Sequence, residues 1–123
     1  DGGHNPQCAE TVAANIADYF PGFRRVLLLG VLADKDFSGM TDMLNTQADE
    51  FITVTPQSPR AMKAQELAVF LQDRYGKRAS AAQSIEEGVK MALDSVRNDD
   101  NAVAVAVGSL YMSGPIRACF GLK

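Results

Sequence analysis

Three short segments combine glycine with polar side chains and could bind a small anionic molecule. They are residues 1–6 (DGGHNP), residues 30–36 (GVLADKD) and residues 108–111 (GSLY). Glycine lets the backbone approach a ligand closely, and each segment leads into a stretch with helical spacing. The first turn of a helix has free N–H groups and a partial positive charge, which favours anions. The three segments therefore predict a site for an anionic small molecule, provided that the fold brings them together.

Each candidate side chain in these segments also has a purely structural interpretation. Asn5 could act only as a helix cap, and His4 could be an ordinary surface histidine. Lys35 lies between two aspartates and could belong to a solvated turn. Ser109 could be a helix cap after a strand. Residue type and spacing alone leave both interpretations open.

Apolar runs predict the β-strands that would position the three segments. Three runs cover residues 26–29, 51–55 and 102–107, and a short strand is predicted near residues 78–79. Continuous apolar runs of this length are typical of parallel strands that are covered on both faces. Two of the glycine-containing segments directly follow such a run. They are therefore expected at strand ends.

Helices with recognisable starts separate the predicted strands. Asn5 before Pro6, and Ser58 before Pro59, are typical helix starts, and residues 84–87 (SIEE) form a capping box. The predicted helices cover residues 5–19, 37–44, 58–75, 84–96 and 109–122. The alternation predicts one α/β domain over residues 1–123, with a doubly wound, mostly parallel, Rossmann-like sheet and helices on both faces. The chain opens on a helix start with no strand before it, so we expect a fragment of a longer protein.

Composition excludes several classes of function. Of the 123 residues, 12 are Lys or Arg and 15 are Asp or Glu, so the net charge of −3 argues against a nucleic-acid surface. No apolar run approaches the roughly 18 residues of a membrane span. One histidine and two cysteines favour a cytoplasmic protein without a disulfide framework or a metal site. The sequence also has neither G-x-x-x-x-G-K-[ST] nor G-x-G-x-x-G, so a complete nucleotide site is not expected.

Four motifs in order resemble the C-terminal domain of the folylpolyglutamate synthase/dihydrofolate synthase family, within the Mur ligase superfamily. Residues 1–6 resemble its D-G-x-H-N-P opening, and residues 30–36 resemble its G-V-x-x-D-K-D segment. Residues 55–61 (TPQSPRA) and 108–111 resemble its T-P-x-S-P-R-A and G-S-L-Y segments. The chain departs from the family at Gly3, where alanine is usual, at residues 106–107, where Val-Thr is frequent, and at Pro115, within the last helix.

The resemblance implies an ATP-dependent ligase that adds L-glutamate to a folate, or to dihydropteroate, through an acyl phosphate. In the family, a central domain carries the phosphate loop and the Mg²⁺ ligands. The C-terminal domain binds the incoming glutamate and part of the ATP. The resemblance therefore implies an N-terminal phosphate-loop domain as partner in the same parent chain. It also implies that this domain is inactive alone and holds neither ATP nor Mg²⁺ by itself.

The resemblance also assigns roles to individual residues. Asp1 is the candidate contact to ATP, since a carboxylate can accept hydrogen bonds from a ribose diol. His4, Asn5, Lys35 and Ser109 are the candidates for binding glutamate, and His4 is the candidate catalytic residue. An ammonium such as that of Lys35 can form a charge-assisted hydrogen bond with a substrate carboxylate.

Three further points stay open in the sequence. Arg60, within the third motif, is a weaker binding candidate that could instead anchor its own loop. A phospho-receiver domain has the same length and alternation, but residues 108–111 follow the last predicted strand where a receiver needs a lysine. A stand-alone nucleotide-binding or dehydrogenase-like domain is the other alternative, and the missing glycine fingerprint argues against it.

Overall fold

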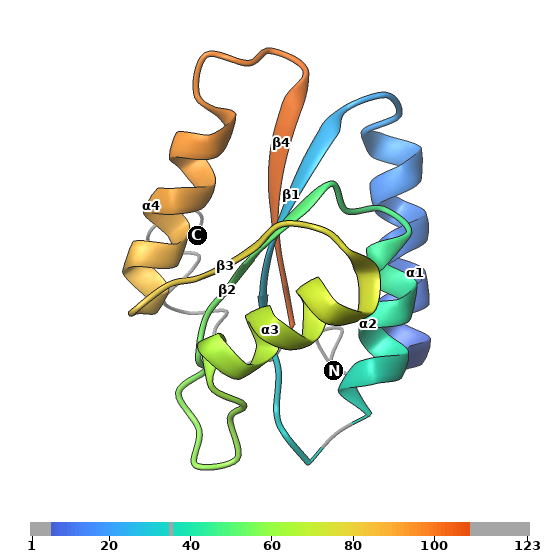
Figure 1. The fold of residues 1–123 in the computed structure, drawn as a ribbon. Helices are drawn as coiled ribbons and strands as arrows, with labels where there is room; N and C mark the ends of the chain where they lie inside the picture. The colour runs from blue at the N-terminus through green and yellow to red at the C-terminus, as the bar shows by residue number, and fades with distance from the viewer. Residues whose placement is uncertain (1–5, 35, 109–123) are drawn as a thin grey trace.

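In the computed structural model, residues 6–34 and 36–108 are described, and four helices alternate with four strands in these ranges (Figure 1). In chain order they are α1 (Pro6–Tyr19), β1 (Arg24–Gly30), α2 (Phe37–Asn45), β2 (Glu50–Thr53), α3 (Ala64–Tyr75), β3 (Ala79–Ala81), α4 (Ile85–Val96) and β4 (Ala102–Gly108). The strands pair in the order β3-β2-β1-β4, and every pairing is parallel. The predicted α/β fold with a parallel sheet is therefore confirmed.

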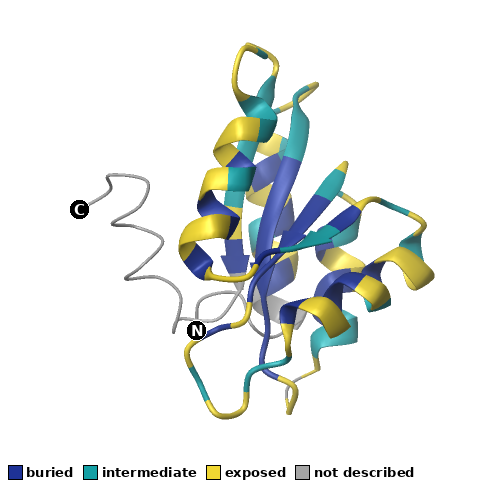
Figure 2. Cartoon of the chain, turned by 60° about the vertical axis from the view of Figure 1, so that its left-hand side comes forward, coloured by how far each residue is buried: buried dark blue, intermediate teal, exposed yellow. Residues whose placement is uncertain are grey.

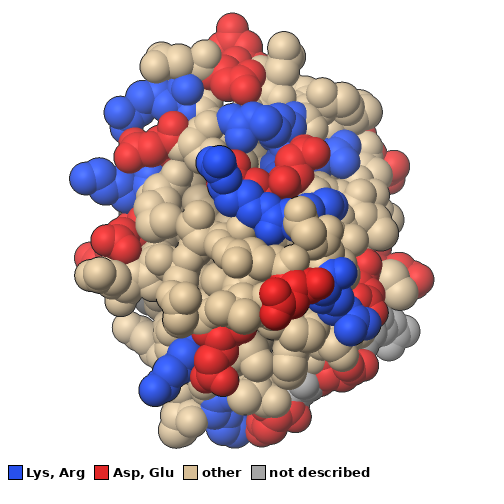
Figure 3. Space-filling view, viewed as in Figure 1, with Lys and Arg blue, Asp and Glu red and all other residues tan. Residues whose placement is uncertain are grey.

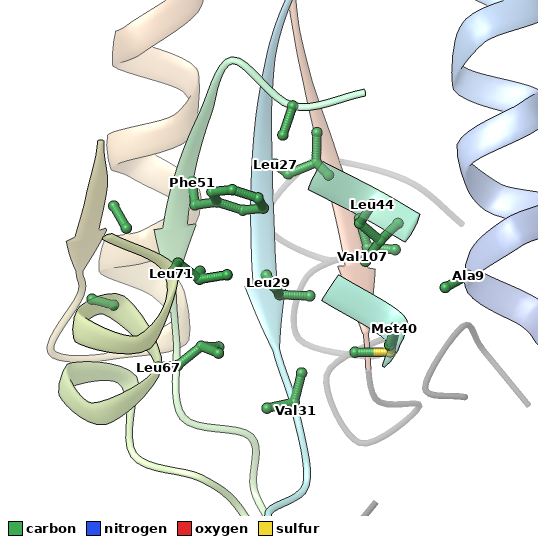
Figure 4. Close-up of a cluster of buried hydrophobic side chains, with 13 residues drawn as sticks. Ala9, Leu27, Leu29, Val31, Met40, Leu44, Phe51, Leu67, Leu71 and Val107 are labelled. Atoms are coloured by element: carbon green, nitrogen blue, oxygen red, sulfur yellow. The ribbon is translucent and has the colours of Figure 1, made fainter. Parts of the chain in front are cut away.

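Helices α1, α2 and α3 cover one face of the sheet, and α4 packs on the other. Alternate side chains of residues 26–29 in β1 enter two separate cores, and these four are fully buried (Figure 2). Leu27 and Leu29 join the core beneath α1–α3, which Figure 4 shows, whereas Val26 and Leu28 join the core beneath α4. Burial on both faces explains why the sequence of β1 is an unbroken apolar run.

Strand β2 is shorter than predicted, ending at Thr53 rather than at residue 55. The N–H of Val54 still donates to the carbonyl oxygen of Leu29 at 2.9 Å, but the chain then leaves the sheet. The buried hydroxyl of Thr53 donates to the carbonyl oxygen of Ala64 at 2.8 Å. The end of β2 is thus tied to the start of α3.

Helix α3 begins at Ala64, so the predicted start at Ser58 is wrong. The Ser58 hydroxyl instead accepts a hydrogen bond from the N–H of Arg60 at 3.1 Å, which makes a local turn. Lys63, the residue before α3, is extended and its side chain makes no capping bond. The hydroxyl of Thr55 accepts from the N–H of Ala64 at 2.9 Å and does the capping. A cap that comes from nine residues upstream leaves no local signature in the sequence.

The helix start predicted at residues 84–87 is found in the structure. The Ser84 hydroxyl accepts from the N–H of Glu87 at 3.0 Å, and the Glu87 carboxylate accepts from the N–H of Gln83 at 2.8 Å. This arrangement is close to the predicted capping box. Gly76 ends α3 in the left-handed conformation, with φ of 67°. Glycine adopts that conformation without steric cost.

We expect Gly88→Ala to destabilise the domain, although alanine normally favours a helix over glycine by about 1 kcal/mol. Gly88 faces the sheet from α4, and an added Cβ would lie 2.4 Å from Val54 Cγ1 and 3.1 Å from Leu28 Cδ1. Overpacking a core of this kind costs about 1–3 kcal/mol. Urea unfolding should show the loss, with Lys90→Ala on the exposed side of α4 as the control. Equal or greater stability of the Gly88 variant would contradict the close approach.

Candidate functional site

The carboxyl ends of β1 and β4, where two of the glycine-containing segments begin, lie at one edge of the sheet, called here the carboxyl edge. Gly30 and Gly108, the last residues of β1 and β4, are paired in the sheet register. Helix α1 runs opposite to β1, so Pro6, its first residue, also lies toward this edge (Figure 1). The starts of the second and third segments therefore meet, as the sequence predicted, and the helix that follows the first segment starts on the same side of the sheet.

The predicted site residues themselves lie outside the described residues, so their roles stay predictions. They are Asp1, His4, Asn5, Lys35 and Ser109. The predicted helix over residues 109–122 lies outside the described residues as well. The structure describes their neighbours in the sequence: Pro6 follows Asn5, Asp34 and Asp36 flank Lys35, and Gly108 precedes Ser109.

Two loops at the carboxyl edge are joined by backbone hydrogen bonds. The β1–α2 loop covers residues 31–36, and the β2–α3 loop covers residues 54–63. The N–H of Ala33 donates to the carbonyl oxygen of Arg60 at 2.7 Å, and the N–H of Met62 donates to that of Val31 at 3.0 Å. Between these bonds, Leu32 and Ala61 form an antiparallel bridge. The motif of residues 55–61 is therefore hydrogen-bonded to the segment of residues 30–36.

Side chains reinforce this contact between the loops. Arg60 Nη1 lies 3.1 Å from Asp34 Oδ2. Arg60 therefore contacts the loop that carries the D-K-D segment. At the other end of the β1–α2 loop, the Asp36 carboxylate accepts from the N–H of Gly39 at 3.1 Å and caps α2. A carboxylate is favourable at this position because the helix N-terminus is partly positive.

The groups with clearly shifted pKa values, among the described residues, lie on α2, on α3 and just after α3. Arg74 donates two hydrogen bonds to the Asp42 carboxylate, at 2.8 and 2.9 Å, and the Tyr75 hydroxyl donates a third. These bonds lower the pKa of Asp42 to about 2 and raise that of Arg74. Burial and the Asp42 hydrogen bond raise the pKa of Tyr75, and burial lowers that of Lys77. This cluster leaves no signal in the sequence because its partners are more than 30 residues apart.

Charge and composition of the surface are mixed in the described part of the chain. Figure 3 shows acidic and basic side chains interspersed over the face that carries α2 and α3.

None of the helices within residues 6–34 and 36–108 is long and apolar enough to cross a membrane. Nor do these residues include a group of three or more His, Cys, Asp or Glu placed to hold a metal ion.

Comparison with known families decides the relationship that the motifs suggest. Residues 1–110 match the family described as Mur ligase, glutamate ligase domain. The chain belongs to this family. The match includes the first three motifs in full and most of the fourth, so the resemblance drawn from the sequence is confirmed. As a Mur ligase glutamate ligase domain, the chain is neither a receiver domain nor a dehydrogenase-like module.

Relatives of known structure share the fold over the whole chain. The dihydrofolate synthase/folylpolyglutamate synthase of Mycobacterium tuberculosis is 29% identical over 133 residues, which cover 98% of this chain and 27% of that protein. A structure of the M. tuberculosis folylpolyglutamate synthase complexed with ADP and AMPPCP matches with a TM-score of 0.86 and 29% identity, covering 100% of this chain and 29% of that one. The bifunctional enzyme of Yersinia pestis, complexed with AMPPNP and Mn, matches with a TM-score of 0.83 and 25% identity, covering 99% and 28%. This chain therefore spans less than a third of the length of these relatives.

Proposed function

We propose that this chain is the glutamate-binding C-terminal domain of a longer ATP-dependent ligase that adds L-glutamate to a folate or to dihydropteroate. The main support is the match of residues 1–110 to the glutamate ligase domain family. The convergence of Gly30 and Gly108 at the carboxyl edge agrees with this function, because open α/β sheets bind ligands at that edge. This chain covers 27% of the length of the M. tuberculosis relative, so the other domains of such an enzyme would lie in the rest of the parent chain.

The proposed reaction has two chemical steps. A carboxylate oxygen of the pterin substrate attacks the γ-phosphorus of ATP, ADP leaves, and an acyl phosphate forms. The amine nitrogen of glutamate then attacks the acyl carbon, and the tetrahedral intermediate loses inorganic phosphate. The nitrogen gives up a proton as the amide forms. The contribution of this domain is to hold glutamate so that its amine meets the acyl carbon, which is work of positioning.

The glutamate site that we propose uses residues from all three segments. Lys35 and Ser109 bind carboxylate oxygens of glutamate, and Asn5 and His4 hold the amino acid from the start of α1. His4 additionally orients the amine, and Asp1 contacts the ATP ribose. Support comes from the motifs and from the positions of the described residues beside them: Asp34, Asp36 and Gly108 all lie at the carboxyl edge.

The remaining groups belong to the preceding domain of the proposed ligase. The 123 residues contain no G-x-x-x-x-G-K-[ST] loop, so another domain supplies the phosphate cradle and the Mg²⁺ ligands. The partners are thus glutamate, a folate, ATP and that N-terminal domain. We place the ligase in the cytoplasm, in agreement with the two cysteines in these 123 residues.

A ligation assay on the full-length protein tests the proposal. Purified enzyme is incubated with ATP, Mg²⁺ and labelled L-glutamate, with dihydropteroate in one reaction and tetrahydrofolate in a parallel one. We expect glutamate-dependent release of phosphate and a labelled amide product in at least one of them. A protein that uses neither pterin, or that joins another amino acid in preference to glutamate, would contradict the proposal.

We expect Lys35→Ala and Ser109→Ala, each made in the full-length enzyme, to raise the KM for glutamate about tenfold while the KM for ATP changes far less. Loss of one charge-assisted hydrogen bond costs about 1.5–3 kcal/mol, which corresponds to a tenfold or greater loss of affinity. Steady-state kinetics with each substrate varied in turn gives both constants. Lys63→Ala removes an exposed lysine from the neighbouring loop and serves as the control. If both variants keep the wild-type glutamate dependence, neither residue belongs to the site.

A further inference from the structure

The ion pair between Asp34 and Arg60 has no part in the function proposed so far. It lies at the carboxyl edge, joins residues 26 positions apart, and brings Arg60 Nη1 to 3.1 Å from Asp34 Oδ2. The side chains of Arg60 and Asp34 are 46% and 49% exposed. Exposed pairs of this kind add little to the free energy of unfolding. The two backbone bonds and the fully buried Leu32 already hold the loops together.

The pair does change the electrostatics around the D-K-D segment. Lys35 is the one cation in this segment, and an aspartate lies on each side of it in the sequence. The carboxylate of Asp34 is engaged by Arg60. That of Asp36 accepts from the N–H of Gly39 at 3.1 Å and from the hydroxyl of Ser38 at 3.3 Å. Both acidic neighbours of Lys35 therefore have partners of their own.

We propose that Arg60 is a positioning residue for glutamate binding, acting through Asp34. By engaging Asp34, it keeps that carboxylate from competing for the Lys35 ammonium, and it reduces the negative charge that an anionic amino acid meets at the carboxyl edge. This inference rests on the proposed function. Arg60 then affects the affinity for glutamate but neither the chemical step nor ATP binding.

The test uses Arg60→Ala and Arg60→Lys in the full-length ligase. We expect Arg60→Ala to raise the KM for glutamate roughly three- to tenfold, less than the loss of a direct charge-assisted contact because Arg60 acts through Asp34, with kcat and the KM for ATP within about twofold. Arg60→Lys keeps the positive charge and should restore most of the affinity. Arg74→Ala is the matched control, because Arg74 is 45% exposed and pairs with Asp42 away from the carboxyl edge. It should leave both KM values unchanged.

A second substitution distinguishes this electrostatic role of Arg60 from a role in merely holding the two loops together. If the freed Asp34 carboxylate weakens glutamate binding, then Asp34→Asn in the Arg60→Ala background should bring the KM for glutamate back toward wild type. If the pair only ties the loops together, the double variant stays as poor as Arg60→Ala. The melting temperature of each variant is measured alongside the kinetics.

Every outcome of these measurements either supports or overturns the inference. An unchanged KM for glutamate in Arg60→Ala, or no recovery in the double variant, would overturn it. So would a parallel rise of both KM values with a lower melting temperature. A wild-type enzyme that ligates no glutamate would instead overturn the proposed function, and this inference with it. Wild-type ligation with an insensitive Arg60→Ala variant overturns the inference alone.

Discussion

The isolated domain should neither hydrolyse ATP nor join glutamate to a folate, even when Mg²⁺, ATP and both substrates are present at saturation. Phosphoryl transfer depends on a phosphate cradle and a metal ion that neutralise the charge developing on the oxygens. The sequence contains no phosphate-loop motif, and its described residues have no acidic or histidine cluster for a metal. Release of phosphate and labelled amide product, measured beside the full-length enzyme, should show complete loss of activity.

This result is informative only if the isolated domain is folded. The two cores on either side of the sheet are made from its own helices and strands, from Ala9 in α1 to Val107 in β4, so we expect cooperative unfolding without a partner. Circular dichroism and urea unfolding check this. Mg²⁺-dependent ATP turnover by a folded domain, above that of a mock purification, would contradict the division of labour between the two domains.

The fold was predictable because its signals are local or periodic. The buried run from Val26 to Leu29 and the Ser84 cap each depend on a few neighbouring residues, and the structure confirms both. The start of α3 was not predictable in the same way. Ser58 followed by Pro59 is a good helix start on local grounds, yet the loop is held by β1–α2 backbone groups and α3 is capped by Thr55. Contacts between distant residues outweigh the local preference.

The candidate site was predictable only in outline. Parallel strands and the rule for their carboxyl ends were enough to expect that Gly30 and Gly108 would meet, and they are paired. The partner of Arg60 could not be read from the sequence, because Asp34 and Asp36 are both aspartates and both lie in a different loop. The structure distinguishes them: Asp34 pairs with Arg60, and Asp36 caps α2. That distinction is what makes the role of Arg60 testable.

The structural and catalytic interpretations of His4 lead to different results for His4→Ala in the full-length ligase. An ordinary surface substitution changes stability by no more than about 0.5 kcal/mol and leaves the rate unchanged. We expect the fold to be kept but kcat/KM for glutamate to fall at least tenfold, which is about 1.4 kcal/mol of transition-state stabilisation. His4 lies two positions before Pro6, the first residue of α1, and α1 starts toward the carboxyl edge, where an imidazole could hold the amine of glutamate toward the acyl carbon.

Kinetics and thermal unfolding of the same preparations decide between the two interpretations of His4. Glu10→Ala, an exposed substitution on α1, is the control for any change in the helix itself, and it should match wild type in both measurements. If His4 orients the amine, the loss appears in glutamate-dependent turnover, while ATP saturation and the melting temperature stay as in Glu10→Ala. General-base catalysis would add a pH dependence of kcat that vanishes with the imidazole, since histidine titrates near neutral pH. A His4 variant that equals Glu10→Ala in rate and stability would assign His4 to the surface.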